Sequence, residues 1–182
     1  MAQIDRRAAL AALTGLAGAA PALAQSAAPA APPSGPRVAR AVTPLKELRK
    51  EGDVACLYHC DFGDPARFSQ MLVNIGNHYS AYGADPFALQ LVVVAHGPGI
   101  KFFLSALDET PWREEATVPQ IWPRIEALFK NGLRVHLCNI TFERQKIDRA
   151  LARAHENVLV TPSGVATVAD LQNKGFAYIK IG

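Results

Sequence analysis

The feature that most constrains the fold is a near-continuous run of apolar, largely β-branched residues at positions 89–95, Leu-Gln-Leu-Val-Val-Val-Ala. Such a run is typical of a strand covered on both faces of a parallel sheet, whereas a strand with one face in water alternates apolar and polar side chains. Parallel strands require crossover connections, which are usually helices. The run therefore predicts an α/β domain.

The rest of the chain alternates between short apolar runs and helical patterns. The other expected strands are residues 54–60, 133–138, 158–160 and 176–181. Apolar residues at helical spacing predict helices at residues 65–83, 121–129, about 141–154 and about 164–175, with a shorter helical stretch at about 100–107. This alternation predicts an α/β three-layer sandwich with a five-stranded, mostly parallel sheet.

Residues 1–24 have the layout of a cleavable export signal. Arg6 and Arg7 directly precede a mild apolar run rich in alanine, which closes on small residues at Ala22 and Ala24. A short basic region, an apolar region and a small-residue cleavage site define a secretory signal, and the paired arginines favour the twin-arginine (Tat) route. We therefore expect a periplasmic protein.

The segment at residues 25–41 is rich in Ala, Pro, Ser and Gly, a composition that predicts a flexible linker, so the folded domain is expected at residues 42–182. The chain has a formal net charge of +3, of which the signal carries one unit, leaving +2 after cleavage. So small a charge argues against a nucleic-acid partner. No second apolar run is long enough to cross a bilayer, so we expect no membrane span after cleavage.

Ligands of parallel α/β sheets bind beyond the carboxyl ends of the strands. The residues expected at this edge are His59, Cys60, Asp61, His96, Gly97, Gly99, Cys138, Asn139, Ser163 and Gly164. Cys138 directly precedes an expected helix, and the start of a helix favours a thiolate, the reactive form of cysteine. The position suits nucleophilic or sulfur-carrying chemistry, but by itself it leaves a structural role open.

The three cysteines raise the question of a disulfide, because an exported protein meets oxidising conditions. Cys56 is deep within its run and is interpreted as a small buried apolar residue. Cys56 and Cys60 are about 13 Å apart on an extended strand, beyond bridging range. Cys60 and Cys138 both end strands, and we expect them to lie close enough for oxidation to protect or switch the reactive thiol.

Metal binding through His59, His96, Cys60 and Cys138 is a minority interpretation. The chain contains none of the usual zinc or haem spacings, so no metal and no cofactor are predicted. The Gly97-Pro98-Gly99 turn has the composition to bind an anion, but the chain has no nucleotide-binding loop.

Several segments resemble the DsrE/DsrF-like (YchN-like) family, and specifically a branch with an export signal. They are Asp61-Phe-Gly-Asp-Pro-Ala-Arg67, Asn74-Ile-Gly-Asn-His78, Val93-Val-Ala-His-Gly-Pro-Gly-Ile-Lys101, Leu137-Cys-Asn-Ile-Thr141, and Pro162-Ser-Gly-Val165 leading to Gly175-Phe-Ala-Tyr-Ile-Lys180. The resemblance spans about residues 52–182. It implies a small α/β fold that assembles into homo-oligomers, commonly trimers or hexamers.

The resemblance also implies a role for one cysteine, since sulfur-handling members of the family carry persulfide sulfur between partner proteins. The matching residue is Cys138, with His96 and Asn139 at recurrent positions of the same pocket, whereas the family gives Cys60 no role. The leading hypothesis is a periplasmic sulfur carrier, sulfurtransferase-like at most, that exchanges sulfur with exported donor or acceptor proteins. His96, Gly97, Gly99, Asn139, Cys60 and His59 are its candidate binding residues.

Two alternatives stay open at this stage. One is a non-catalytic oligomeric accessory protein that binds a small ligand or a metal in the pocket at the strand ends. The other is a structural partner in a redox or respiratory complex.

Overall fold

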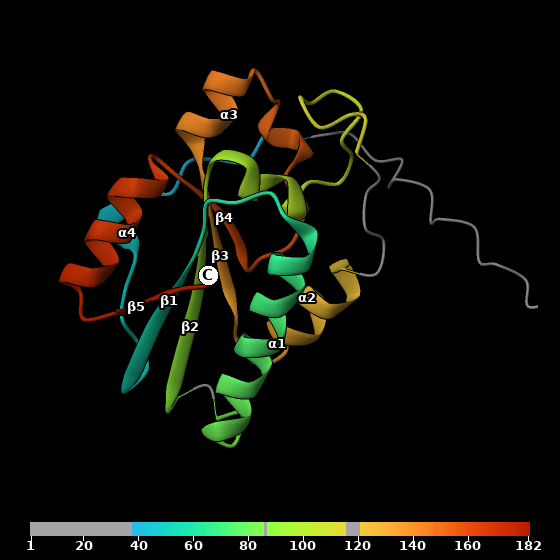
Figure 1. Ribbon diagram of the computed structural model, residues 1–182. Helices are drawn as coiled ribbons and strands as arrows, with labels where there is room; N and C mark the ends of the chain where they lie inside the picture. The colour runs from blue at the N-terminus through green and yellow to red at the C-terminus, as the bar shows by residue number, and fades with distance from the viewer. Residues whose placement is uncertain (1–37, 86, 116–120) are drawn as a thin grey trace, which may run out of the picture. The chain divides into compact units, whose positions relative to one another are not determined.

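The computed structural model describes residues 38–85, 87–115 and 121–182 (Figure 1). The predicted signal peptide and residues 25–37 of the predicted linker lie outside these ranges. Arg40, from the end of that linker, donates hydrogen bonds to the backbone carbonyls of Val158 (2.6 Å), Arg153 (2.8 Å) and His155 (3.0 Å). Contacts between the described chain and the folded domain therefore begin two residues before the expected boundary.

Five strands form a single sheet in the order β4-β3-β2-β1-β5, and all four strand pairs are parallel. The strands are β1 (Val54–Cys60), β2 (Leu89–Ala95), β3 (Arg134–Cys138), β4 (Val158–Thr161) and β5 (Ala177–Lys180). The bounds of β1 and β2 equal those predicted, because continuous apolar runs and the polar residues that end them mark a buried strand clearly. The expected fold class, α/β with a five-stranded parallel sheet, is confirmed.

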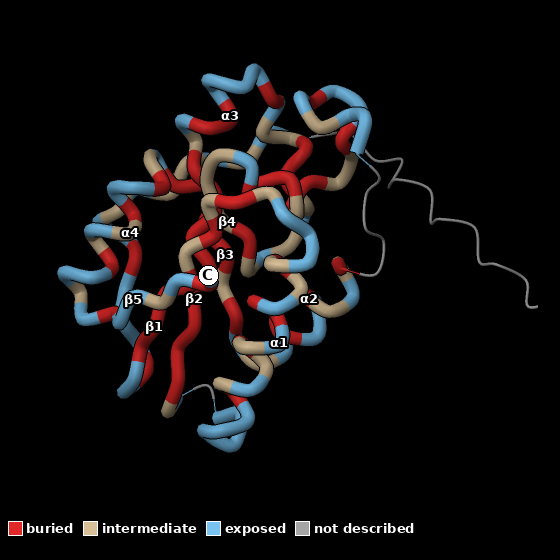
Figure 2. Tube along the Cα trace, viewed as in Figure 1, coloured by how far each residue is buried: buried red, intermediate tan, exposed pale blue. Residues whose placement is uncertain are grey.

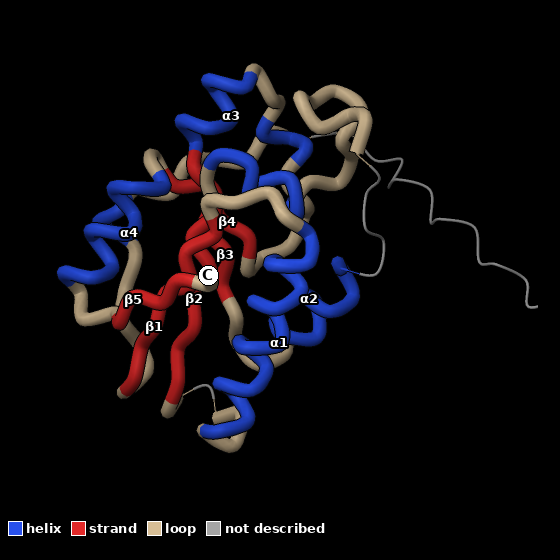
Figure 3. The backbone as a smooth tube through the Cα atoms, viewed as in Figure 1, coloured by secondary structure: helices blue, strands red, loops and turns tan. Residues whose placement is uncertain are grey.

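Helices cover both faces of the sheet (Figure 3). The helices are α1 (Pro65–Ala81), α2 (Ile121–Phe129), α3 (Asn139–Gln145) and α4 (Gly164–Asn173), with 3-10 turns at Leu45–Glu47, Gly97–Phe103 and Arg149–Leu151. The α1 and α2 helices pack on one face, α4 packs on the other, and α3 stands beyond the carboxyl end of β3 (Figure 1). None of the described helices is long and apolar enough to cross a membrane.

The two faces carry different cores, although β2 is buried along its whole length and β1, β3 and β4 along most of theirs (Figure 2). The edge strand β5 is mostly exposed. The larger core lies on the α1/α2 face and includes Phe68, Leu91 and Ile125. The smaller core lies on the α4 face and includes Leu57 and Leu171. Because successive side chains of a strand point to opposite faces, neighbouring residues of one strand contribute to different cores.

Two predicted helices are wrong in detail. The helix expected to run to residue 154 ends at Gln145, because Lys146 adopts a left-handed conformation (φ 55°) and its N–H closes the last turn on the carbonyls of Phe142 and Glu143. The helical stretch expected at about 100–107 is instead a 3-10 helix at Gly97–Phe103. Gly97 (φ 53°) starts this turn in the left-handed region, which glycine adopts without steric cost.

Candidate functional site

A pocket of about 350 Å³ opens at the carboxyl end of the sheet. Its walls come from the segments that follow β2 and β3 and from the start of α4. The lining residues are His96, Gly97, Cys138, Ile140, Thr141, Arg144, Gln145, Ser163 and Val165. The structure thus brings four of the residues expected at this edge, His96, Gly97, Cys138 and Ser163, to one pocket.

Cys138 is the last residue of β3 and the N-cap of α3. Its neighbour Leu137 is part of the core on the α1/α2 face, so strand alternation turns Cys138 toward the opposite, α4 face. The residue is 5% exposed, and its thiol forms no disulfide. This placement combines shielding from bulk solvent with access to the pocket.

Arg144 is the charged residue among the pocket's lining side chains, apart from any charge on His96 or Cys138. It lies on the same side of α3 as Thr141, since residues three apart face the same direction on a helix. The Thr141 hydroxyl oxygen accepts a hydrogen bond from the backbone N–H of Gly97 (3.0 Å) and so joins α3 to the turn after β2. The pocket therefore presents a thiol, a guanidinium group and a fixed hydroxyl to any molecule that enters.

The two glycine N–H groups expected to bind an anion already have partners in this structure. The N–H of Gly97 donates to Thr141, and that of Gly99 donates to the backbone carbonyl of His96 (3.1 Å). Gly99 does not line the pocket but packs on β1, where an added Cβ would lie 2.2 Å from the carbonyl oxygen of Cys60. Positive charge for an anionic ligand comes instead from Arg144.

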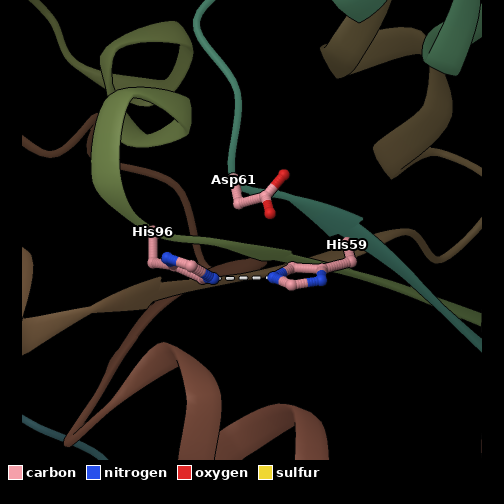
Figure 4. Close-up of side chains that lie close together, drawn as sticks. All are labelled: His59, Asp61 and His96. Atoms are coloured by element: carbon pink, nitrogen blue, oxygen red, sulfur yellow. Dashed lines mark hydrogen bonds between the residues drawn. The ribbon is translucent and has the colours of Figure 1, made fainter. Parts of the chain in front are cut away.

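His59 and His96 face each other from the ends of β1 and β2, with their Nε2 atoms 2.6 Å apart (Figure 4). The Nδ1 atom of His59 lies 2.7 Å from the hydroxyl of Tyr178 on β5. Burial is the largest cause that lowers the pKa of both imidazoles, and the charge of Lys180 acts in the same direction. Both rings are therefore neutral at neutral pH, and one hydrogen is shared between the two Nε2 atoms.

Asp61 follows directly after β1 and is ion-paired with Lys180 of β5. Burial alone raises the pKa of Asp61, but the hydrogen bond from Lys180 and the nearby positive charge outweigh it, and the net shift is downward. Figure 4 shows the carboxylate of Asp61 beside the two imidazole rings. His59, Asp61 and His96 thus form one cluster in which a ligand-type atom from each residue lies within 4.8 Å of the others.

The expected proximity of Cys60 and Cys138 is wrong. The β2 strand lies between β1 and β3, so the two strand ends are roughly 10 Å apart, whereas a disulfide needs Cα atoms within about 7 Å. Cys60 is in register with Ala95 and through it with Leu137, so its side chain faces the α1/α2 core and not Cys138. Burial raises the pKa of the Cys60 thiol to about 12.

Like His59, Cys60 and Gly99, the predicted binding residue Asn139 does not line the pocket. Its side-chain N–H donates to the carboxylate of Glu143 (2.7 Å), and its Oδ1 atom is buried without a hydrogen-bond partner among the described residues. Sequence reasoning missed Thr141, Arg144 and Gln145. Thr141 lies three residues after Cys138, and Arg144 and Gln145 lie three and four residues after Thr141. This helical spacing was the signal that they share one face.

The fold and site define a small parallel α/β domain with a cysteine at a strand end, beside a pocket. The profile of the DsrE/DsrF-like family matches residues 42–181, and the chain belongs to that family. Membership suggests a function of the sulfur-relay type in general. A search of curated proteins found no match to this chain.

A solved structure supports the fold assignment independently. The protein of unknown function MTH1491 from Methanobacterium thermoautotrophicum superposes with a TM-score of 0.56 at 22% sequence identity. The match covers 70% of this chain and 99% of the other. At this identity the similarity concerns the fold, and it extends over the whole of the smaller protein.

Proposed function

We propose that this protein is a periplasmic sulfur carrier that holds sulfane sulfur as a persulfide on Cys138. The observation that carries the proposal is that Cys138 lines the pocket, whereas Cys60 faces a closed apolar core and Cys56 packs in the same core. Family membership supports sulfur relay in general, and the place of Cys138 at the pocket supports this cysteine as the carrier.

The proposed reaction is a transfer of one sulfur atom between thiols. The Cys138 thiolate attacks the terminal sulfur of a donor persulfide, an S–S bond forms at Cys138, and the donor's S–S bond breaks with its electron pair remaining on the donor thiolate. With thiosulfate, the same attack releases sulfite. An acceptor thiolate then takes the sulfur in the reverse sense and regenerates the Cys138 thiolate, so that the cycle needs no oxidant or reductant.

The residues around Cys138 have distinct roles in this scheme. The Arg144 guanidinium attracts anionic sulfur donors and balances the charge of the bound persulfide. The imidazole of His96 forms a hydrogen bond to the persulfide or moves a proton to the departing thiolate. Thr141 holds the Gly97 turn in place and so keeps His96 and Cys138 at the same pocket.

The test is mass spectrometry of the chain after incubation with thiosulfate or polysulfide. A mass increase of one or more sulfur atoms on the peptide that contains Cys138, lost on reduction, is expected. Cys138→Ser should remove the adduct, while Cys60→Ser, the matched control at the other strand end, should retain it. An adduct that persists in Cys138→Ser would contradict the proposal.

The proposal includes export through Tat and assembly into a trimer or hexamer, which would meet exported partner proteins. Replacement of Arg6 and Arg7 by lysine should stop export of a reporter fused to residues 1–41. Light scattering on the purified domain should give the oligomer mass. Export that ignores both arginines, or a monomer at all concentrations, would remove the corresponding part of the proposal.

A further inference from the structure

Of the cluster of His59, Asp61 and His96, only His96 lines the pocket and has a role in the proposed sulfur transfer. Its three residues come from the ends of two adjacent strands, and each is half-buried and so open to small solutes. Sequence spacing contains no metal motif here, because the ligands are brought together by strand pairing and not by closeness along the chain.

We infer that His59, Asp61 and His96 form a binding site for a divalent first-row transition metal ion such as zinc. Two imidazole nitrogens and a carboxylate oxygen are ligands that zinc and similar ions accept, and three protein ligands leave a coordination position open. Calcium and magnesium prefer sites made of oxygen atoms alone. The inference goes beyond the proposed function and does not depend on it.

The environment of His59 favours a metal ligand at Nε2. A histidine ligand usually donates its second ring N–H to a fixed acceptor, which orients the ring and sets its tautomer. The Tyr178 hydroxyl, 2.7 Å from Nδ1 of His59, is positioned as that acceptor. With Nδ1 protonated, the lone pair of Nε2 points toward His96, as Figure 4 shows for the ring orientation.

The spacing of the cluster requires a small adjustment on binding. The two Nε2 atoms are 2.6 Å apart, whereas nitrogens bound to one tetrahedral zinc ion at 2.0–2.1 Å lie roughly 3.3 Å apart. On metal binding the hydrogen between the rings moves to Nδ1 of His96, which leaves an Nε2 lone pair on each ring for the ion, and the rings separate by side-chain rotation. The Asp61 oxygen moves toward the same centre from within 4.8 Å.

Lys180 opposes the metal ion. Its ammonium group is ion-paired with Oδ1 of Asp61, which occupies one carboxylate oxygen and places a positive charge beside the site. Like charges a few ångströms apart repel strongly where solvent screening is incomplete. Removing this charge should therefore tighten metal binding, an effect that loss of a purely structural ion pair does not produce.

The experiment is a titration of the untagged full chain, stripped of metal with a chelator, with zinc by calorimetry and with cobalt(II) by visible absorption. One ion per chain is expected. His59→Ala, Asp61→Asn and His96→Ala should each weaken binding at least about 100-fold, and Tyr178→Phe about tenfold. Lys180→Met should tighten binding about tenfold.

The opposite face of the sheet supplies a matched control. His78 is half-buried and its Nδ1 lies 3.0 Å from the hydroxyl of Tyr58, much as His59 contacts Tyr178. His78→Ala should leave the affinity unchanged, and so should Cys138→Ser, which separates this inference from the sulfur-carrier proposal. Binding that is absent, that survives all three ligand replacements, or that is lost in Cys138→Ser would overturn the inference. If a ligand variant fails to fold, the response to Lys180→Met decides.

Discussion

The two faces of the sheet each present a cysteine at the end of a strand, and the two environments differ. Cys60, on the α1/α2 face, is fully buried in an apolar core and is covered by the backbone at Gly99. Cys138, on the α4 face, is nearly as buried but lines a pocket. Burial alone therefore does not distinguish the two cysteines, whereas the presence of a pocket beside Cys138 does.

The polar content of the two faces follows the same division. The buried polar residues His136, Thr161 and Thr167 lie on the α4 side, where the Thr167 hydroxyl donates to the carbonyl of Ser163 (2.7 Å) and lies 2.8 Å from the Thr161 hydroxyl. The large core of the α1/α2 face is built from apolar side chains and provides most of the apolar burial. One face holds the larger apolar core, and the other holds the groups to which the proposed chemistry is assigned.

Thiol labelling gives the largest expected difference between the faces. With a pKa of about 12, the Cys60 thiol is ionised in roughly one molecule in 10⁴ at pH 8, and only the thiolate reacts with alkylating reagents. Cys138, which lines a pocket, should therefore react with iodoacetamide much faster than Cys60. Peptide mass spectrometry at successive times measures both rates. Equal rates would show that the α1/α2 face opens readily.

Alanine in place of glycine should affect the two faces to different extents. In Gly99→Ala the new Cβ meets backbone, 2.2 Å from the carbonyl oxygen of Cys60, and a loss of about 3 kcal/mol or more in the free energy of unfolding is expected. In Gly164→Ala the new Cβ meets the side chain of His96 at 2.7 Å, and a smaller loss of about 1–2 kcal/mol in the free energy of unfolding is expected. The Cys138 thiol should also react more slowly in this variant.

Urea unfolding measures both losses. Gly76→Ala is the control, because its Cβ would meet only a methyl group of Leu128 at 4.0 Å and should not destabilise the helix. A Gly99→Ala protein as stable as this control would contradict the close packing on Cys60.

His136 should make stability sensitive to acid. Burial lowers its pKa to about 3, and its Nδ1 atom has no partner among the described residues. Between pH 6.5 and 3 the unfolded chain binds a proton at this residue that the folded chain does not, so the free energy of unfolding falls as pH falls. From pH 7 to pH 5 the unmodified protein should lose about 2 kcal/mol more than His136→Leu. Parallel curves for the two proteins would show that His136 titrates when folded.

Charge removal at Arg144 should have the smallest effect. Arg144→Gln is expected to slow formation of the Cys138 persulfide from thiosulfate about three- to tenfold at low salt, because one favourable charge near the surface contributes little and is screened. Lys130→Gln removes an equal charge from an exposed position at the end of α2 and should leave the rate unchanged. The ratio of the two rates at low and high salt is the measurement, and equal slowing in both variants would exclude a local role.

Much of the local structure could be predicted, because buried runs such as residues 89–95 carry a strong periodic signal. The carboxyl edge was also predictable, since it follows from the parallel fold, and it placed His59, His96 and Cys138 at one end of the sheet. The order of the strands could not be predicted, because long-range packing determines it. The prediction that Cys60 and Cys138 lie close together was wrong for this reason, because β2 lies between their strands.

The same reason explains the residues that were missed. Lys180 and Tyr178 reach Asp61 and His59 only because β5 pairs with β1, and no local pattern encodes that pairing. The early end of α3 depends on a left-handed Lys146, a conformation that the residue type does not signal. Arg144 was within reach of prediction, but the length assigned to the helix obscured which residues border the pocket.

The position of β5 also sets an order of assembly during protein synthesis. The residues that line the Cys138 pocket are complete once residue 165 has emerged from the ribosome, whereas the contacts of His59 and Asp61 wait for Tyr178 and Lys180. Arg67 holds this end by donating from Nε to the carbonyl of Ile181 (2.8 Å). The histidine cluster therefore acquires its final surroundings later in synthesis than the pocket does, and only in a chain that includes β5.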